Sequence, residues 1–283
     1  MVFMIYSDIK FRPKPQYPVY PPYHTGDYLE DYFFNRFEKE NPSTERDYIG
    51  ISWTTLYCDN KREGLQQFLN SLPKDRKYFT VSQHDDAPQE LLPPDTICFS
   101  AGGNIQGSNI IPIPLICSKL PIEFIDTHKR ELLASFVGSA THPIRIKMAH
   151  ACQNSKEIKL YIKNWTPSVN QNEFDTFINL TANSIFCLCP RGYGLNSFRL
   201  YEAMQLGSIP VVITNQYYLP WQDELNWNEF AVLISEKQLP DLQSILESYK
   251  EEQLESMRQK IKEVYPKYFT LDGMYANILR RIK

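Results

Sequence analysis

Residues 185–213 read IFCLCPRGYGLNSFRLYEAMQLGSIPVVI, and this stretch decides the fold. The continuous apolar run Ile185–Cys189 predicts a buried strand, which a glycine-containing loop follows. A helix is expected to begin at about Asn196 or Ser197, because either side chain can cap the first helical amides. The apolar run Ile209–Ile213 then predicts a second buried strand. A strand, a glycine loop, a helix and a strand in this order indicate one unit of a parallel α/β sheet.

The loop and the helix start are suited to binding an anion. Backbone amides and the positive end of the helix dipole attract negative charge there, and Arg191 and Arg199 add formal positive charge. Glu202 follows Arg199 by three positions, so the two side chains share roughly one helix face. A carboxylate next to a phosphate site is suited to binding ribose hydroxyls. The phosphate site and the carboxylate together favour a nucleotide diphosphate as the ligand. An ordinary Arg–Glu surface pair explains the same spacing equally well.

The glycine spacing also resembles a dinucleotide-binding fingerprint. Gly192, Gly194 and Ser197 occupy the three positions of that pattern, so the third position lacks its glycine. The strand after the helix ends in Thr214-Asn215, where an enzyme that binds NAD usually places an acidic ribose ligand. A nicotinamide-dependent oxidoreductase is therefore the alternative and not the favoured interpretation.

Strand and helix patterns alternate along most of the chain, which is typical of parallel sheets covered on both faces. Expected strands lie at 47–57, 77–83, 95–101, 131–139, 159–165, 184–190 and 208–214, and expected helices at 26–41, 61–73, 142–152 and 172–182, with a helical tail from 241. The proline-rich segment 110–124 shows no sustained period, so we place a hinge there. The predicted division is a first lobe over 1–118 and a second over 119–252, with 253–283 returning to the first lobe.

Composition excludes several classes of partner. The chain has 30 Lys and Arg against 33 Asp and Glu, so no overall field favours nucleic acid. Six cysteines lack the spacing of a zinc site, and no metal is expected. No apolar run approaches the ~18 residues of a membrane span. The expectation is a cytoplasmic protein without a membrane anchor.

The motifs CPRGYGLNSFRLYEAMQLGSIPVV (189–212) and LPWQDELNWNEFAVLI (219–234) closely resemble the donor-binding half of the exostosin family. The stretches HTGDYLEDYFF (24–34), KYFTVSQHDD (77–86) and Phe136-Val137-Gly138 with Arg145 resemble the same family. Its members are usually anchored in the Golgi membrane by an N-terminal span. This chain departs from that pattern and is similar to the small untethered exostosin-domain enzymes of some large algal viruses.

The resemblance implies a GT-B fold, in which two Rossmann-like lobes with parallel sheets face a central cleft. It implies inverting transfer of a sugar from a UDP donor, held mainly by the second lobe, to a glycan hydroxyl, held mainly by the first. No metal or other cofactor is implied, in keeping with the absence of an Asp-x-Asp motif from the sequence. The residues that the resemblance and the loop chemistry together assign to donor binding are Arg145, Arg191, Gly192, Asn196, Ser197, Arg199 and Glu202.

Inverting transfer also needs a base that takes the proton of the acceptor hydroxyl. The base is expected in the first lobe, at the carboxyl end of a strand, which is where His84-Asp85-Asp86 follow YFTVSQ. Adjacent carboxylates repel each other, so one of them is expected to have a raised pKa. An ordinary solvated turn is the alternative for this trio, and His24, Asp27 and Glu30 are the next candidates for the base.

The sequence does not define the donor sugar. The likeness to algal-virus enzymes favours a pentose, xylose first, and an acceptor that is a protein-linked glycan. A glycan-binding protein that kept the fold without catalysis is the remaining alternative, and the presence of Arg191, Arg199 and Glu202 argues against it.

Overall fold

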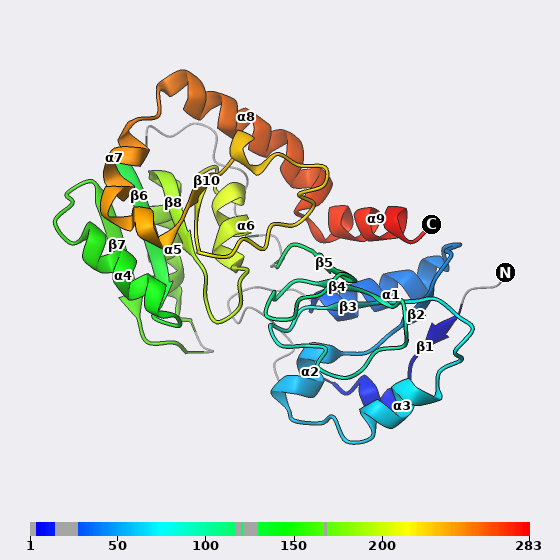
Figure 1. Ribbon diagram of the computed structural model, residues 1–283. Coiled ribbons are helices and arrows are strands. Elements are labelled where there is room, and N and C mark those ends of the chain that lie inside the picture. The colour runs from blue at the N-terminus through cyan, green and yellow to red at the C-terminus, as the bar shows by residue number, and fades with distance from the viewer. Residues whose placement is uncertain (1–3, 15–27, 117–119, 121–129, 167–168) are drawn as a thin grey trace.

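The computed structural model describes residues 4–14, 28–116, 120, 130–166 and 169–283. Its strands form two five-stranded sheets, one in each of two lobes (Figure 1). Neighbouring strands run parallel throughout both sheets. The predicted α/β class and the GT-B arrangement of two Rossmann-like lobes are therefore confirmed.

The sheet of the first lobe has the strand order β1-β2-β3-β4-β5. Side chains alternate between the two faces of the sheet along each strand, and helices pack on both faces. Phe79 of β3 packs on Phe37 of α1, whereas Tyr78 belongs to a separate apolar cluster with α2 and α3. The elements are β1 (Ile5–Tyr6), η1 (Ile9–Phe11), α1 (Leu29–Glu40), β2 (Asp47–Ile49), α2 (Trp53–Cys58), α3 (Leu65–Ser71), β3 (Tyr78–Ser82), β4 (Ile97–Ser100) and β5 (Ile110–Pro112).

The strand predicted over 47–57 is wrong beyond Ile49, because residues 53–58 form helix α2. The Glu30 carboxylate, which α1 carries, accepts hydrogen bonds from the Thr54 amide at 2.9 and 3.1 Å and from the Thr54 hydroxyl at 2.9 Å. The first amides of a helix have no partner within the helix, and Glu30 provides one for Thr54 from 24 positions earlier in the chain. A distant cap therefore outweighs the strand preference of the β-branched residues.

The proline-rich segment contains one regular element that the sequence did not predict. Strand β5 pairs with β4 at the edge of the first sheet, with Ile110 opposite Cys98. The predicted boundary between residues 118 and 119 lies outside the described residues.

The sheet of the second lobe has the order β10-β9-β8-β6-β7. The chain builds β6 and β7 first and then crosses to the other side of β6, so the order reverses between β6 and β8. The strands are β6 (Leu132–Ser139), β7 (Ile158–Lys163), β8 (Ser184–Pro190), β9 (Ile209–Ile213) and β10 (Val232–Ile234). The helices are α4 (Pro143–Cys152), α5 (Gln171–Ala182), α6 (Phe198–Gln205), η2 (Trp227–Glu229), η3 (Glu236–Asp241) and α7 (Leu242–Glu247).

Residues 253–283, which were expected to return together to the first lobe, divide between two helices with different partners. Helix α8 (Glu251–Tyr268) packs on β9 and α6 of the second lobe, and α9 (Leu271–Arg281) lies against α1 of the first. Figure 1 shows α9, in red, beside α1. Phe33 of α1 packs on Tyr275 of α9 with ring centroids 5.1 Å apart, and Arg36 forms an ion pair with Asp272.

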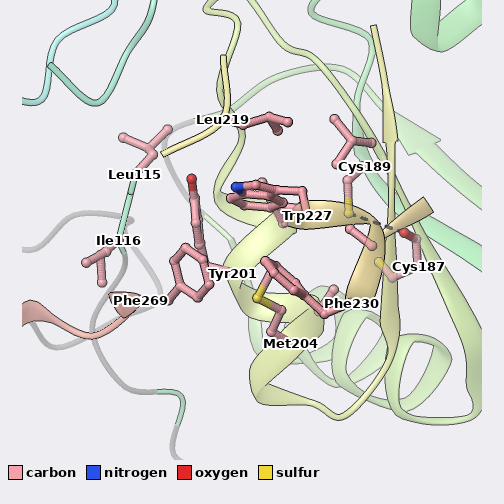
Figure 2. Packing of buried hydrophobic residues seen from close by; sticks show 14 of the residues in the cluster. Leu115, Ile116, Cys187, Cys189, Tyr201, Met204, Leu219, Trp227, Phe230 and Phe269 are labelled. Atoms are coloured by element: carbon pink, nitrogen blue, oxygen red, sulfur yellow. Dashed lines mark hydrogen bonds between the residues drawn. The ribbon is translucent and has the colours of Figure 1, made fainter. Parts of the chain in front are cut away.

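One apolar core continues from the second lobe to the end of the first. Leu115 and Ile116 belong to the same buried cluster as Tyr201 of α6 and lie on its side of the core (Figure 2). Trp227 belongs to the same cluster, and its ring centroid lies 5.4 Å from that of Phe269, which in turn lies 5.6 Å from that of Tyr201. Because apolar side chains from both lobes are buried in this one cluster, the two sheets are fixed relative to each other.

A buried asparagine adds polar contacts across the same boundary. The Asn196 amide group donates to the carbonyl oxygens of Ala101 at 2.9 Å and Ile113 at 3.3 Å. Its carbonyl oxygen accepts from the Tyr201 hydroxyl and the Ser197 amide, each at 2.9 Å. The amide group therefore has no proton left for a ligand, so the side chain connects the lobes in place of its predicted donor contact.

Replacing Asn196 by alanine is expected to destabilise the protein. The two first-lobe carbonyls and the Tyr201 hydroxyl each lose a buried partner, which costs about 2 kcal/mol in total free energy of unfolding. A thermal melt should show a Tm lower by several degrees. The control is Asn228→Ala at an exposed position, and equal Tm values for the two variants would contradict the assigned role.

Candidate active site

A cavity of about 490 Å³ lies between the lobes and is lined by both of them. Gln83, His84 and Asp85 contribute from the end of β3 in the first lobe. The second lobe contributes the ends of β6 and β7, the first turns of α5 and α6, and the glycine loop after β8. The volume falls in the range of small-molecule sites.

The structure brings eight of the ten predicted site residues to this cavity. The residues that line it are His84, Asp85, Arg145, Gly192, Asn196, Ser197, Arg199 and Glu202. Asp86 and Arg191 lie beside the cavity without lining it. Ser197 precedes α6 as expected, but within the described residues its hydroxyl makes no capping hydrogen bond.

The cavity lies at the point where the strand order of the second sheet reverses. Strands β6 and β8 are neighbours there, and their carboxyl ends lead to Thr141 and Gly192 in the cavity wall. Open parallel sheets bind ligands at such a point, because the loops of the two strands diverge and leave a crevice. The topology therefore places the binding site where the glycine loop was predicted to hold an anion.

Arg145 of α4 lies buried at this crevice. Its guanidinium donates to three backbone carbonyls at the ends of β6 and β8, those of Ser139 at 2.7 Å, Arg191 at 3.1 Å and Pro190 at 3.3 Å. No carboxylate of the described residues forms an ion pair with it. Burial first, and then the nearby Arg199, lower the pKa of Arg145 to about 10. The guanidinium remains charged at neutral pH and favours an anion in the cavity.

Arg199 and Glu202 form a buried pair in the cavity wall. Their side chains are 13% and 1% exposed, and Nη1 of Arg199 lies 2.7 Å from Oε2 of Glu202. The Arg199 guanidinium also lies over the Phe177 ring, 3.8 Å from its centroid. The pair predicted from the spacing therefore exists, but it is not the solvated surface pair that was the alternative interpretation.

Two glycines of the loop touch charged groups from opposite sides. A β-carbon at Gly192 would come within 3.0 Å of Nη2 of Arg145, and one at Gly194 would lie 2.0 Å from Oδ1 of Asp85. Only glycine fits at residue 194, because no side-chain atom can approach a neighbour so closely. The loop thus brings the first-lobe carboxylate and the second-lobe guanidinium to the same short segment.

Asp85 has the properties of a group that exchanges protons near neutral pH. Burial, and secondarily the adjacent Asp86, raise its pKa to about 7, although Arg191 acts in the opposite direction. Its neighbour His84 has a lowered pKa, chiefly because it is buried. Of the two carboxylates in the trio, Asp85 lines the cavity. The raised pKa has the predicted direction, but its main cause is burial, and repulsion by the adjacent carboxylate comes second.

Asp86 and Arg191 are held by neighbouring groups. The Asp86 carboxylate accepts from the Asn104 side chain and from the Tyr193 hydroxyl, both at 2.9 Å. The Arg191 guanidinium donates to the loop carbonyls of Gly192 at 3.3 Å and Tyr193 at 2.8 Å. Both residues therefore shape the turn and the loop around the cavity.

Glu30, one of the next candidates for the base, has a structural position. Its carboxylate accepts from the amides of Thr54 and Gln83, and burial raises its pKa to about 8. It ties α1 to α2 and to the end of β3 without lining the cavity. The other two candidates, His24 and Asp27, lie outside the described residues.

The sequence did not reveal several other lining residues. Trp165 is 67% exposed and Tyr193 is 60% exposed at the cavity, and Lys163 pairs with Glu173 at 2.6 Å in the same wall. Trp165 and Lys163 belong to the end of β7 and the loop after it, a position that the carboxyl-end rule for parallel strands could have identified.

The described part of the chain has neither a candidate metal site nor a candidate membrane span. It contains no group of three or more His, Cys, Asp and Glu side chains that could hold a metal ion. None of its helices is both long enough and apolar enough to cross a bilayer.

The two Rossmann-like lobes and the cavity between them define a protein of the GT-B type. The exostosin GT47 domain matches residues 57–249. The chain belongs to the exostosin GT47 family. A probable glycosyltransferase of Arabidopsis thaliana is 33% identical over 141 residues, which cover 50% of this chain and 28% of the relative. The exostosin-1 homolog of Caenorhabditis elegans is 31% identical over 139 residues, which cover 48% and 36%.

Two solved structures resemble the chain at low identity. TarM has a TM-score of 0.44 at 10% identity and covers 77% of this chain and 52% of its own. The pneumococcal O-GlcNAc transferase GtfA, in complex with UDP and GlcNAc, has a TM-score of 0.42 at 13% identity and covers 79% and 47%. The chain thus spans 28% and 36% of the two curated relatives named above.

Replacing Asp85 by asparagine is expected to stabilise the protein, increasingly so as pH rises. The folded-state pKa of about 7 lies above the value of about 4 for an unfolded aspartate. The contribution of this carboxyl to stability is therefore fully present below about pH 4 and is lost as pH rises through about 7. Because the two pKa values differ by about three, we expect a gain of about 4 kcal/mol at pH 8, or several degrees in Tm.

The matched control is Asp75→Asn, which removes an exposed carboxylate from the same lobe. Melting curves at pH 5 and pH 8 should show a gain for Asp85→Asn that is larger at pH 8, and no such trend for the control. A gain that is independent of pH would mean that the pKa of Asp85 is not raised.

Proposed function

We propose that the chain is an inverting, metal-independent glycosyltransferase that moves a sugar from a UDP donor to a glycan hydroxyl. One observation carries the proposal. The same cavity presents a buried guanidinium at the switch point of the second sheet and a carboxylate with a raised pKa from the first lobe. Membership of the exostosin GT47 family supports the same activity.

The second lobe supplies the groups for the donor. The proposed diphosphate would lie against the guanidinium groups of Arg145 and Arg199, which line the wall, and against the amino end of helix α6, although Glu202 offsets part of the Arg199 charge. Both charges stabilise the diphosphate as it leaves with negative charge, which is the task that a metal ion performs in other transferases. Glu202, 1% exposed beside Arg199, is the proposed acceptor for a ribose hydroxyl.

Asp85 is the proposed base. The acceptor oxygen attacks the anomeric carbon from the face opposite UDP, a carbon–oxygen bond forms, and the bond to the diphosphate oxygen breaks with its electron pair leaving on UDP. The acceptor proton passes to the Asp85 carboxylate. With a pKa of about 7, Asp85 is about half ionised at neutral pH and is strong enough to accept that proton.

Xylose remains the first donor sugar to test, and a protein-linked glycan the first acceptor. Both rest on the resemblance to algal-virus enzymes and not on a contact in the cavity. A screen of UDP-sugars for hydrolysis by the purified protein identifies the donor directly.

UDP at millimolar concentration is expected to raise the Tm in the presence of EDTA. A ligand that binds the folded state alone stabilises it by about 2.7 kcal/mol at one hundred times its dissociation constant. NADH serves as the parallel titration, because the glycine spacing also suits a dinucleotide. A shift with NADH and none with UDP would favour the oxidoreductase.

Substitutions in the two walls are expected to separate binding from chemistry. Asp85→Asn should retain UDP affinity and lose at least about a hundredfold in turnover, because the variant cannot accept the proton. Glu202→Gln should weaken UDP binding about tenfold, through the loss of a charged hydrogen-bond acceptor.

Calorimetry with UDP and an assay of UDP release measure these two effects, with Asp75→Asn as the control. Full turnover by Asp85→Asn would assign the base to another residue. Glycan binding without UDP release by the wild-type protein would favour the silent glycan-binding alternative.

A further inference from the structure

Tyr193 lies between the two glycines of the loop, and its side chain forms a hydrogen bond from the second lobe to the first. Its hydroxyl donates to Oδ2 of Asp86 at 2.9 Å. The side chain is 60% exposed, so its ring adds little to the core. Neither the anion-binding role of the loop nor the base role of Asp85 uses this hydroxyl. The hydrogen bond from this hydroxyl to Asp86 therefore has a role separate from anion binding and from proton transfer.

The partner of Tyr193 holds the turn that carries the proposed base. The other oxygen of Asp86 accepts from the Asn104 side chain at 2.9 Å, and the Asp86 amide donates to Nδ1 of His84 at 3.1 Å. The Asn104 amide also donates to the backbone carbonyl of Asp85 at 3.1 Å. Asp86 is thus the central residue of a small hydrogen-bond network around Asp85, and Tyr193 donates to that network from the other lobe.

The two residues that flank Tyr193 lie against the two charged groups of the site. Gly194 leaves no room for a β-carbon beside the Asp85 carboxylate, and Gly192 lies against the Arg145 guanidinium. A donor bound at Arg145 would contact this loop, since Gly192 lines the cavity with Arg145. Any change in the loop therefore reaches Asp85 through the packing at Gly194 and reaches Asp86 through the Tyr193 hydroxyl.

We propose that Tyr193 is a positioning residue that couples occupation of the donor site to placement of Asp85. The inference rests on the proposed function, because it takes a UDP group to be the occupant of the donor site. The glycine loop fixed by the diphosphate holds the Tyr193 hydroxyl, the hydroxyl holds Asp86, and Asp86 holds the turn that presents Asp85 to the acceptor.

Hydrogen exchange with and without UDP tests the coupling without turnover. In the wild-type protein, UDP should slow exchange of the amides in the glycine loop and also of the Asp86 and Asn104 amides. In Tyr193→Phe, UDP should slow the loop amides alone. The control is Tyr217→Phe, which removes the hydroxyl of an exposed tyrosine of the same lobe that lines no part of the cavity. It should behave as the wild type.

Kinetics test the consequence for the reaction. Tyr193→Phe should lower kcat about tenfold, which is the effect of one lost hydrogen bond to a charged group. Its KM for the donor and its affinity for UDP should stay within about twofold of the wild-type values. Asp86→Ala should lower kcat as well, and adding Tyr193→Phe to it should change nothing further, because the hydroxyl acts through Asp86.

The outcomes separate the inference from the proposed function. A wild-type protein that binds no UDP and releases none from any UDP-sugar refutes both. A wild-type protein that binds UDP, with Tyr193→Phe showing the same exchange at Asp86 and the same kcat, refutes the positioning role alone. Additive losses in the double variant would show that Tyr193 acts independently of Asp86 and would also refute it.

Discussion

The guanidinium of Arg145 sets the main constraint on this structure. It is buried at the junction of β6 and β8 and is compensated only in part, by the dipoles of three strand-end carbonyls. Burial of a charge without an opposite charge lowers the free energy of unfolding, and it creates a local positive potential in the cavity. The cavity lies beside this guanidinium because β6 and β8 diverge there, the glycine loop approaches without side chains, and the α6 amino end points to the same wall.

The opposite wall carries the opposite charge, and the lobes are held so that the two remain close. Asn196 ties the start of α6 to the carbonyls of Ala101 and Ile113, and α9 returns to α1. The Asp85 carboxylate therefore lies against Gly194 in this arrangement, partly desolvated by the packing that closes the cavity. Its raised pKa and its contact with the loop have one cause, the close approach of the lobes. The same packing that lowers stability at alkaline pH thus prepares a proton acceptor.

What the sequence predicted was local, and what it missed depends on contacts between distant segments. The strand, loop, helix and strand of 185–213 lie in one stretch, so their periodicity and glycines predicted β8, α6 and β9 correctly. Arg145 entered only through the resemblance to the exostosin family. Helix α2 was missed because its cap comes from Glu30, and the bond from Tyr193 to Asp86 spans 107 positions. No pattern in either segment signals such a bond. Asn196 was predicted to contact the donor, but its side-chain amide donates to the carbonyls of Ala101 and Ile113 in the other lobe, which are far away in the sequence.

A crystal structure of the protein grown with saturating UDP shows whether the diphosphate binds at the buried guanidinium of Arg145. We expect electron density for the diphosphate in the cavity between the lobes, in contact with Arg145 or with the backbone of the loop from Gly192 to Ser197. A cavity that stays empty under these conditions, or a nucleotide bound elsewhere on the molecule, would contradict the claim that the buried guanidinium exists to hold the diphosphate.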